Sequence, residues 1–398
     1  MGAYLGVFAV TAGVVVVATP LVRKLAIRVK AIDVPSERKI HTRPLPTMGG
    51  LAMLLGVTAG LVAAWFAPSL RPAFRFSSEL QGAALAAVAI AIVGAVDDLR
   101  TLSAPAKVAG QVFAAGILIL NGVALLVFWF PSQGVISLGS DLAVPLTVLW
   151  VLIVVNAVNL IDGLDGLAAG IVAIAAAAFF VYAYRVPDVF GQPQSTAAIL
   201  SAVTAGAAVG FLPFNFSPAK ILMGDTGSML LGLLLAAATI SGIGRTGQPT
   251  GHDIAAFSIP VLIPVLVLVV PLVDVALAIV RRLRRGRAVF APDKQHIHHQ
   301  LREIGHSDRQ AVLMMYLWSA VLAGCALAIT FVGSRRTASA VLSFAALVIV
   351  VTVAPRVWRA VRISREGRAA AAAQAAKPRP RPAGDVAPSE PSSPAGAA

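Results

Sequence analysis

Residues 143–184 read AVPLTVLWVLIVVNAVNLIDGLDGLAAGIVAIAAAAFFVYAY, and this stretch decides the fold class. Two apolar runs flank one short polar turn, and each run is long enough to cross a bilayer core of about 30 Å as a helix. The pattern recurs along the chain, in which 58% of the residues are hydrophobic and 13% are charged, whereas a soluble domain carries about 25% charged residues. A large soluble all-α core would need helices with a polar face, and segments such as Val172–Phe180 and Val261–Val270 have none. The sequence therefore predicts an all-α, polytopic integral membrane protein.

Apolar blocks of this kind predict about eleven transmembrane helices. The loops assigned to the cytoplasmic side hold 18 of the 32 Lys and Arg residues, the loops on the opposite side hold 6, and the C-terminal tail holds 8. Because Lys and Arg are enriched in cytoplasmic loops, the N-terminus is predicted to lie outside and the C-terminus in the cytoplasm. The predicted spans are residues 3–22, 49–66, 80–97, 105–121, 143–160, 165–184, 195–213, 227–243, 254–280, 311–333 and 337–355.

The chain divides into a predicted transmembrane domain, residues 1–355, and a cytoplasmic tail, residues 356–398. The tail is basic at first and then rich in Ala and Pro, so it cannot bury an apolar face and is expected to be disordered. The chain has a formal net charge of +14. We interpret this positive charge as a signal of which loops face the cytoplasm, and we expect no nucleic acid partner. In the loop 121–142 a short outer hairpin is expected. The oligomeric state stays open, with a homodimer as one alternative.

Asp97 and Asp98 end the predicted third span. Carboxylates at the C-terminus of a helix meet the negative end of the helix dipole, and two adjacent negative charges also repel each other. Such a pair favours a nearby cation, either Lys107 or a divalent metal ion. The alternative is a solvated helix end that marks the membrane edge.

The polar turn inside the opening stretch offers several oxygen ligands. Asn156, Asn159, Asp162 and Asp165 lie within ten residues at the end of the fifth span and the start of the sixth. Amide and carboxylate oxygens suit Mg²⁺, which shares its coordination shell with waters and substrate phosphates. The alternative for Asp165 is a simple cap on the helix that follows.

The segment Gly224-Asp225-Thr226-Gly227-Ser228 opens the eighth predicted span. Asp225 followed by small polar residues fits an N-cap, and capping alone is one interpretation of the segment. The same helix end can also hold phosphate through its free backbone N–H groups.

Two further segments are candidates for donor binding. His296, His298 and His299 lie in the longest predicted cytoplasmic loop. No thiol accompanies them, so contact with a diphosphate or nucleotide is favoured over a zinc site. The first cytoplasmic loop carries several basic residues and ends in Gly49 and Gly50. This loop is a candidate for binding the nucleotide, and membrane anchoring is the alternative for its individual Arg and Lys residues.

These motifs together resemble the polyprenyl-phosphate N-acetylhexosamine-1-phosphate transferases. The histidine motif is similar to that of the N-acetylglucosamine-1-phosphate branch, which also separates the chain from the muramoyl-pentapeptide branch with its three consecutive histidines. The resemblance covers residues 1–355 and implies a single bundle of about ten or eleven transmembrane helices. It rests on five stretches: Arg38–Gly50; Asp97 and Asp98 with Lys107 and Gln111; Asn156–Ala168; Asn215–Gly232; and Pro292–His299.

The resemblance also implies roles for individual residues. Asn159 and Asp225 are expected to hold Mg²⁺, with Mn²⁺ as the alternative ion. Asp97 and Asp98 are expected to handle the lipid phosphate, one of them as a base, and Lys107 to hold that phosphate. The other implied substrate-binding residues are Asp162, Asp165, His296, His298, His299, Gly49 and Gly50.

The expected reaction transfers GlcNAc-1-phosphate from UDP-GlcNAc to a polyprenyl phosphate, undecaprenyl or decaprenyl, with release of UMP. The active site is expected on the cytoplasmic face of the plasma membrane, where nucleotide sugars are found. The nearest alternative is the phospho-MurNAc-pentapeptide transferase of peptidoglycan synthesis. A secondary transporter is the alternative from another class, and it predicts polar groups near the middle of the bilayer instead of at one edge.

Overall fold

The computed structural model of the protein describes residues 1–34, 43–130, 134–185, 195–242 and 307–332, together with Ser339 and Ser343. Within these residues the chain forms helices and two short two-stranded sheets. The helices are α1 (Gly2–Arg28), α2 (Gly50–Phe66), α3 (Arg71–Arg75), α4 (Glu79–Arg100), α5 (Ala104–Leu120), α6 (Ser140–Ile161), α7 (Leu167–Arg185), α8 (Ser195–Asn215), α9 (Gly224–Gly242) and α12 (Asp308–Val332).

The protein is helical and crosses the membrane several times, as the sequence predicts. Among the described helices, seven are long and apolar enough to span a bilayer, and α2 and α5 are shorter apolar helices of 17 residues each. Nine of the predicted spans coincide with one of these helices to within a few residues. The predicted spans 254–280 and 337–355 and the tail lie outside the described residues, apart from Ser339 and Ser343. The total of eleven spans and the orientation of the termini therefore stay predictions.

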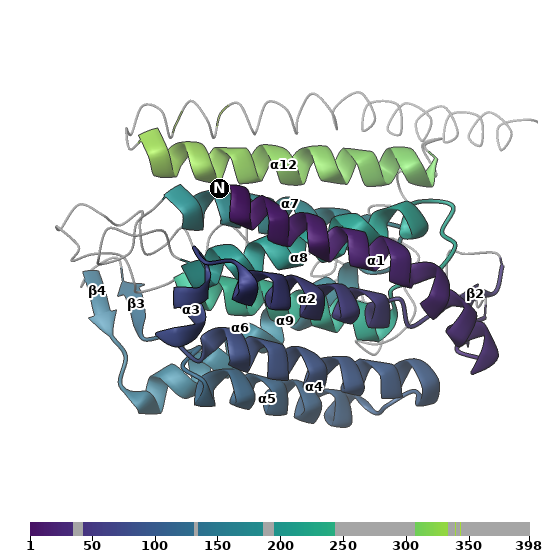
Figure 1. The fold of residues 1–398 in the computed structure, drawn as a ribbon, viewed down its shortest axis with the longest axis horizontal. Coiled ribbons are helices and arrows are strands. Elements are labelled where there is room, and N and C mark those ends of the chain that lie inside the picture. Colours follow the sequence, from purple (N-terminus) through teal and green to yellow (C-terminus); the bar gives the residue numbers. More distant parts are fainter. Residues whose placement is uncertain are drawn as a thin grey trace, which may run out of the picture. The chain divides into compact units, whose positions relative to one another are not determined.

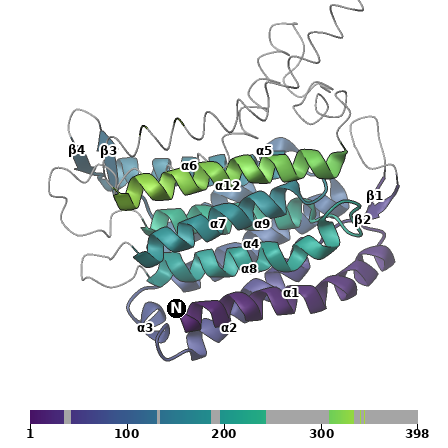
Figure 2. The ribbon, with the colours of Figure 1, turned by 90° about the horizontal axis from the view of Figure 1, so that it is seen from above.

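Helix α9 lies at the centre of the described bundle. Every residue from Thr226 to Gly242 is buried, and the helix packs against α2, α4, α6, α7 and α8 (Figures 1 and 2). Its sequence consists mainly of leucine and small residues, which let neighbouring helices approach closely in a membrane. Because α9 is enclosed in this way, its first residues have a fixed place among the ends of the surrounding helices.

The outer helices present apolar side chains outward. Val17 of α1, Leu85 of α4, Phe113 of α5 and Leu149 of α6 are each more than half exposed. Large exposed apolar surfaces are rare on soluble monomers, and here they suit contact with lipid chains.

Two hairpins lie at opposite ends of the bundle (Figure 1). Strand β3 (Val127–Phe130) pairs antiparallel with β4 (Gly134–Ser137), which confirms the expected hairpin in the loop 121–142. Strand β1 (Ile32–Asp33) pairs antiparallel with β2 (Leu45–Pro46) at the other end. The sequence pattern predicts neither β1–β2 nor α3, because elements of two to five residues are too short to show a hydrophobic period.

Candidate active site

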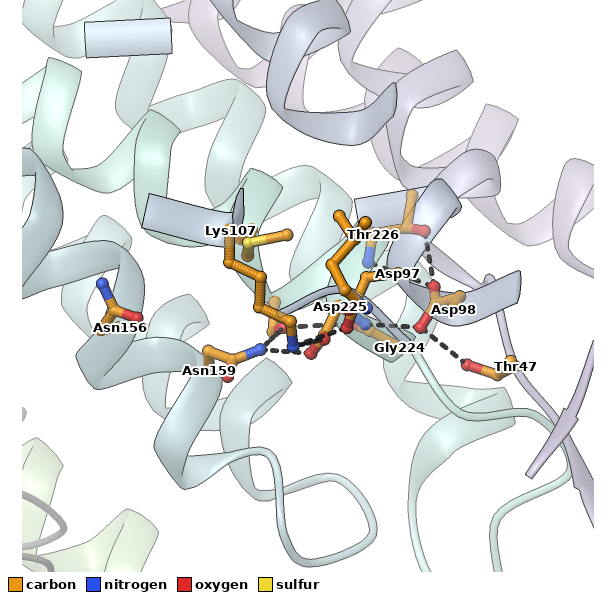
Figure 3. A network of polar contacts seen from close by, with 12 residues as sticks. Thr47, Asp97, Asp98, Lys107, Asn156, Asn159, Gly224, Asp225 and Thr226 are labelled. Carbon is orange, nitrogen blue, oxygen red and sulfur yellow. Dashed lines mark hydrogen bonds and ion pairs between the residues drawn. The ribbon is translucent and has the colours of Figure 1, made fainter. Parts of the chain in front are cut away.

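Polar residues at the ends of several helices come together in one network of contacts (Figure 3). Asp97 and Asp98 lie in the last turn of α4, Lys107 in the first turn of α5, Asn159 in the last turn of α6 and Asp225 in the first turn of α9. Asp98 and Asp225 are in contact although 127 residues separate them in the chain. The predicted gathering of these motifs at one end of the spans is therefore present in the fold.

Lys107 joins two carboxylates from different helices. Its Nζ atom lies 2.5 Å from Oδ2 of Asp97 and 2.5 Å from Oδ2 of Asp225. Asp97 is buried, and its Oδ1 accepts a hydrogen bond from the backbone N–H of Leu102 at 2.5 Å, which fixes the turn between α4 and α5. The ion pair confirms Lys107 as a cation for the acidic end of α4.

Asn159 approaches Asp225 from α6. The Nδ2 atom of Asn159 donates to Oδ1 of Asp225 at 2.5 Å and to Oγ of Ser228 at 2.9 Å. Asp225 therefore accepts from Asn159 on one oxygen and from Lys107 on the other. The two residues that the resemblance implies as metal ligands are in direct contact.

The groups around Asp225 suit a hard divalent cation. In the part of the chain that the structure describes, no three His, Cys, Asp or Glu side chains group as a closed metal site. Mg²⁺ does not require one, because it commonly binds through one or two carboxylates and takes its remaining ligands from water and substrate phosphates. Asp225 and Asn159 are the residues that could hold such an ion. Here Asn159 meets Asp225 through its amide nitrogen, so binding of a metal through the Asn159 oxygen stays a prediction.

Asp98 points away from Lys107, toward the start of α9 (Figure 3). Its Oδ1 accepts from the backbone N–H of Asp225 at 2.9 Å and from the hydroxyl of Thr47 at 3.4 Å. Its Oδ2 accepts from the backbone N–H of Thr226 at 3.2 Å and from the hydroxyl of the same residue at 2.6 Å. The two adjacent aspartates of α4 therefore have different partners.

The turn between α6 and α7 carries Asp162 and Asp165. Burial raises the pKa of Asp162 well above its usual range, and the neighbouring carboxylates raise it further. A nearby cation would oppose both effects by stabilising the charged form. Oδ2 of Asp165 accepts a hydrogen bond from the backbone N–H of Ala219 at 2.9 Å, so this turn is attached to the segment that follows α8.

Comparison with known proteins identifies the family of the chain. Residues 80–243 match the model of glycosyl transferase family 4. The chain is also 42% identical over 351 residues to the decaprenyl-phosphate N-acetylglucosaminephosphotransferase of Mycobacterium leprae (strain TN). This alignment covers 86% of this chain and 87% of the relative. The chain belongs to glycosyl transferase family 4.

Two further relatives are less similar to the chain than the first. The chain is 35% identical over 310 residues to a probable undecaprenyl-phosphate N-acetylglucosaminyl 1-phosphate transferase of Bacillus subtilis (strain 168), covering 78% of this chain and 80% of the relative. It is 32% identical over 334 residues to a phospho-N-acetylmuramoyl-pentapeptide-transferase of Desulforudis audaxviator (strain MP104C), covering 78% and 92%.

The residues matched by the glycosyl transferase family 4 model contain the whole cluster around Asp225, including Asp97, Lys107 and Asn159. Gly49 and Gly50 precede the matched residues. The histidines follow them, and they also lie outside the described residues, so their role in donor binding stays a prediction. The three are His296, His298 and His299.

Gly49 and Gly50 pack against the segment that leads into α9. Their backbone N–H groups donate to the carbonyl oxygens of Leu222, at 3.0 Å, and Met223, at 2.9 Å. A Cβ atom at Gly50 would overlap the backbone where Thr226 joins Gly227. Close backbone approach thus requires glycine here, and contact with a nucleotide stays a prediction for this family member.

Asn156 lies apart from the cluster, one turn before Asn159 (Figure 3). Its Nδ2 donates to Oε1 of Gln111 at 2.7 Å and to the carbonyl oxygen of Leu152 at 2.8 Å. Gln111 is buried and lies one turn after Lys107. This amide pair joins α5 to α6 beside the cluster.

Asn215 is a buried residue to which the sequence alone assigns no role. Its Oδ1 accepts from the backbone N–H of Gly166 at 3.1 Å, and its Nδ2 donates to the carbonyl oxygen of Ile221 at 3.2 Å. It thus links the turn after α6 to the segment before α9. The one sequence signal was its place in the motif stretch Asn215–Gly232.

Replacing Asn215 with leucine is expected to destabilise the protein by about 2–4 kcal/mol, because two buried backbone groups lose their partner. The measurement is the thermal unfolding midpoint of the purified protein in detergent. Ser201→Ala is the matched control, since Ser201 is also buried in α8 but bonds only to a carbonyl of its own helix. An unchanged midpoint for Asn215→Leu would show that the link contributes nothing.

Proposed function

We propose that this protein transfers GlcNAc-1-phosphate from UDP-GlcNAc to a polyprenyl phosphate, giving polyprenyl-diphospho-GlcNAc and UMP. The observation that carries the proposal is the contact of Asp225 with Asn159 and Lys107 at the meeting point of three helix ends. The names of the relatives support the acceptor, decaprenyl phosphate or undecaprenyl phosphate, and the transferred GlcNAc group.

In the proposed reaction an oxygen of the lipid phosphate attacks the β-phosphorus of UDP-GlcNAc. A P–O bond forms to the lipid phosphate, the bond from the β-phosphorus to the bridging oxygen breaks, and UMP leaves with that oxygen. The lipid phosphate is already ionised near pH 7, so placing two anions together is the main difficulty. Phosphoryl transfer of this kind depends chiefly on positioning and on electrostatic stabilisation.

The residues of the cluster divide this work. Asn159 and Asp225 would hold Mg²⁺, or alternatively Mn²⁺, which supplies positive charge to the donor diphosphate when bound. Lys107, held between Asp97 and Asp225, can offer its ammonium group to the incoming lipid phosphate. Asp97 is near enough to Lys107 to orient it and to accept a residual proton from the acceptor.

The setting of the cluster supports a site at the membrane surface. The apolar outer helices suit a lipid acceptor, and the polar groups gather at one end of the bundle rather than at mid-height. This end carries the loops that the distribution of Lys and Arg assigns to the cytoplasm. We therefore place the proposed active site on the cytoplasmic face of the plasma membrane, where a nucleotide sugar is available.

Donor choice separates the proposal from its nearest alternative. With decaprenyl phosphate as acceptor, purified protein is expected to release UMP from UDP-GlcNAc at least about 10²-fold faster than from UDP-MurNAc-pentapeptide. The reason is that a site whose polar groups bind GlcNAc would leave some of them unpaired with the larger donor. Mass spectrometry of the lipid product identifies the transferred group, and omission of the acceptor is the control. Transfer of the MurNAc-pentapeptide group would favour the alternative, and solute flux without UMP release would favour a transporter.

A further inference from the structure

We propose that Asp98 is a positioning residue that caps α9 from a neighbouring helix and so keeps the Asp225 carboxylate available for the ligand and for Lys107. The inference rests on the proposed function, because it assigns a task within the same site. It gives Asp98 a different role from Asp97, whereas the sequence motif assigns one shared role to both residues.

The start of α9 obtains its cap from another helix. The first N–H groups of any α-helix lack partners inside that helix, and a side chain just before the helix usually accepts from them. At α9 the Oδ1 and Oδ2 atoms of Asp98 accept instead from the N–H groups of Asp225 and Thr226. A negative charge at this position is also favoured by the helix dipole.

This arrangement releases Asp225 from capping its own helix. The Asp225 side chain accepts from Lys107 and Asn159, which lie on α5 and α6, while its backbone is held by Asp98. A bond to the backbone N–H of Asp225 fixes the point from which that carboxylate projects. Asp98 therefore acts on the ligand site through Asp225.

Two glycines shape this contact, one on each side. Gly224 has a φ of +70°, and a Cβ atom there would overlap the side-chain oxygens of Asp98 and Thr47. On α4, Gly94 lies one turn before Asp98 on the same face, and a Cβ atom there would lie 2.5 Å from the Cα of Thr226. Larger residues at either place would separate the carboxylate of Asp98 from the helix end.

The Asp98 carboxylate has little capacity left for proton transfer. A carboxylate offers about four lone-pair sites, and four donors already surround this one, two from backbone N–H groups and two from hydroxyls. Asp97, in contrast, pairs with Lys107. If either aspartate accepts a proton from the lipid phosphate, the geometry points to Asp97.

The test measures ligand binding and turnover separately. Mn²⁺ binding to the purified protein without substrates is followed by electron paramagnetic resonance, and UMP release is measured with saturating UDP-GlcNAc and decaprenyl phosphate. Asp98→Ala is expected to weaken Mn²⁺ binding and to lower kcat, each by about tenfold or more. The reason is that the loss of this helix cap would displace Asp225, the proposed metal ligand. Asp98→Asn keeps one acceptor oxygen but turns an amide NH2 toward the donors that the other oxygen accepts from, so it is expected to recover part of both losses.

Gly224→Ala provides a second variant, because its added methyl group would overlap the Asp98 and Thr47 oxygens and strain a left-handed φ, which disturbs the cap without changing Asp98. It is expected to weaken Mn²⁺ binding as Asp98→Ala does, and it keeps the test decisive if Asp98→Ala fails to fold. Gln81→Ala is the control on α4, since Gln81 is exposed and bonds to Phe74, and it is expected to leave both measurements unchanged.

The outcomes distinguish the inference from the proposed function. Normal Mn²⁺ binding in Asp98→Ala and Gly224→Ala would overturn the positioning role. So would a kcat in Asp98→Asn as low as in Asp98→Ala with normal Mn²⁺ binding, because the charge of Asp98 would then act in the reaction itself. If wild-type protein releases no UMP while Asp98→Ala still weakens Mn²⁺ binding, the positioning role is supported and the proposed function fails.

Discussion

Replacing Asp225 with alanine is expected to lower Mg²⁺-dependent UMP release by about 10³-fold or more, which corresponds to about 4 kcal/mol of transition-state stabilisation. The variant loses the carboxylate that meets both Asn159 and Lys107, so the ammonium group of Lys107 and the proposed divalent ion would both lose an anchor. The measurement is the initial rate of UMP release over a range of Mg²⁺ concentrations.

The variant is expected to remain folded in the membrane, because the N–H groups at the start of α9 keep their partner Asp98. A thermal unfolding midpoint near that of the wild type checks this. Asp141→Ala serves as the matched control, since Asp141 is also an aspartate in the first turn of a helix but is exposed and lies in α6. Activity near the wild-type level in Asp225→Ala would remove Asp225 from the mechanism.

Replacing Lys107 with methionine is expected to lower the rate by about 10²-fold, as for loss of one preorganised charge at a transferring phosphoryl group. Methionine keeps most of the side-chain length but has no charge, so Asp97 and Asp225 would lose the cation between them. The apparent KM for the lipid phosphate is expected to rise as well, because the incoming anion would meet two carboxylates without the intervening ammonium group. The measurement is the dependence of UMP release on acceptor concentration.

A lysine elsewhere provides the control for this change. Lys24 is exposed near the C-terminal end of α1, and Lys24→Met is expected to change the rate by less than about twofold, because an exposed surface charge contributes little. A Lys107→Met variant with wild-type kcat and wild-type acceptor KM would show that Lys107 serves only the packing of α4 and α5.

The sequence predicts the helices and their shared polar end well, for a simple physical reason. Apolar blocks long enough to cross a bilayer are visible without knowledge of neighbours, and the bias of Lys and Arg assigns their ends to sides. These two signals suffice to predict that Asp97, Asn159 and Asp225 lie at the same end of the bundle. The sequence also predicts a cation at the acidic end of α4, either Lys107 or a divalent metal ion, and the structure pairs Lys107 with Asp97.

The division of tasks between Asp97 and Asp98 could not be predicted from the sequence. Neighbouring residues on a helix project about 100° apart, so one carboxylate meets Lys107 and the other meets the start of α9. Which of them meets which partner depends on how α4 is rotated against α9. That rotation is set by tertiary packing, including the close approach at Gly94.

The packing contacts of Asn215 and Gly50 could not be predicted either, because they also depend on tertiary structure. Asn215 bonds to backbone groups of two other segments, and backbone partners leave no pattern in the sequence. Gly50 is required by the backbone of Gly227, which is remote in the chain. A motif can therefore indicate that such positions belong to the site without showing whether they contact substrate or packing partners.

Asn159 and Asp225 are proposed to share one divalent ion at this end of the bundle. Anomalous diffraction from crystals grown with Mn²⁺ and UDP tests it most directly. We expect an anomalous peak about 2.1 Å from an oxygen of Asp225 and from the amide oxygen of Asn159, the ligand distance typical of Mg²⁺ sites. A peak at a different group of residues, with none between Asn159 and Asp225, would contradict the claim.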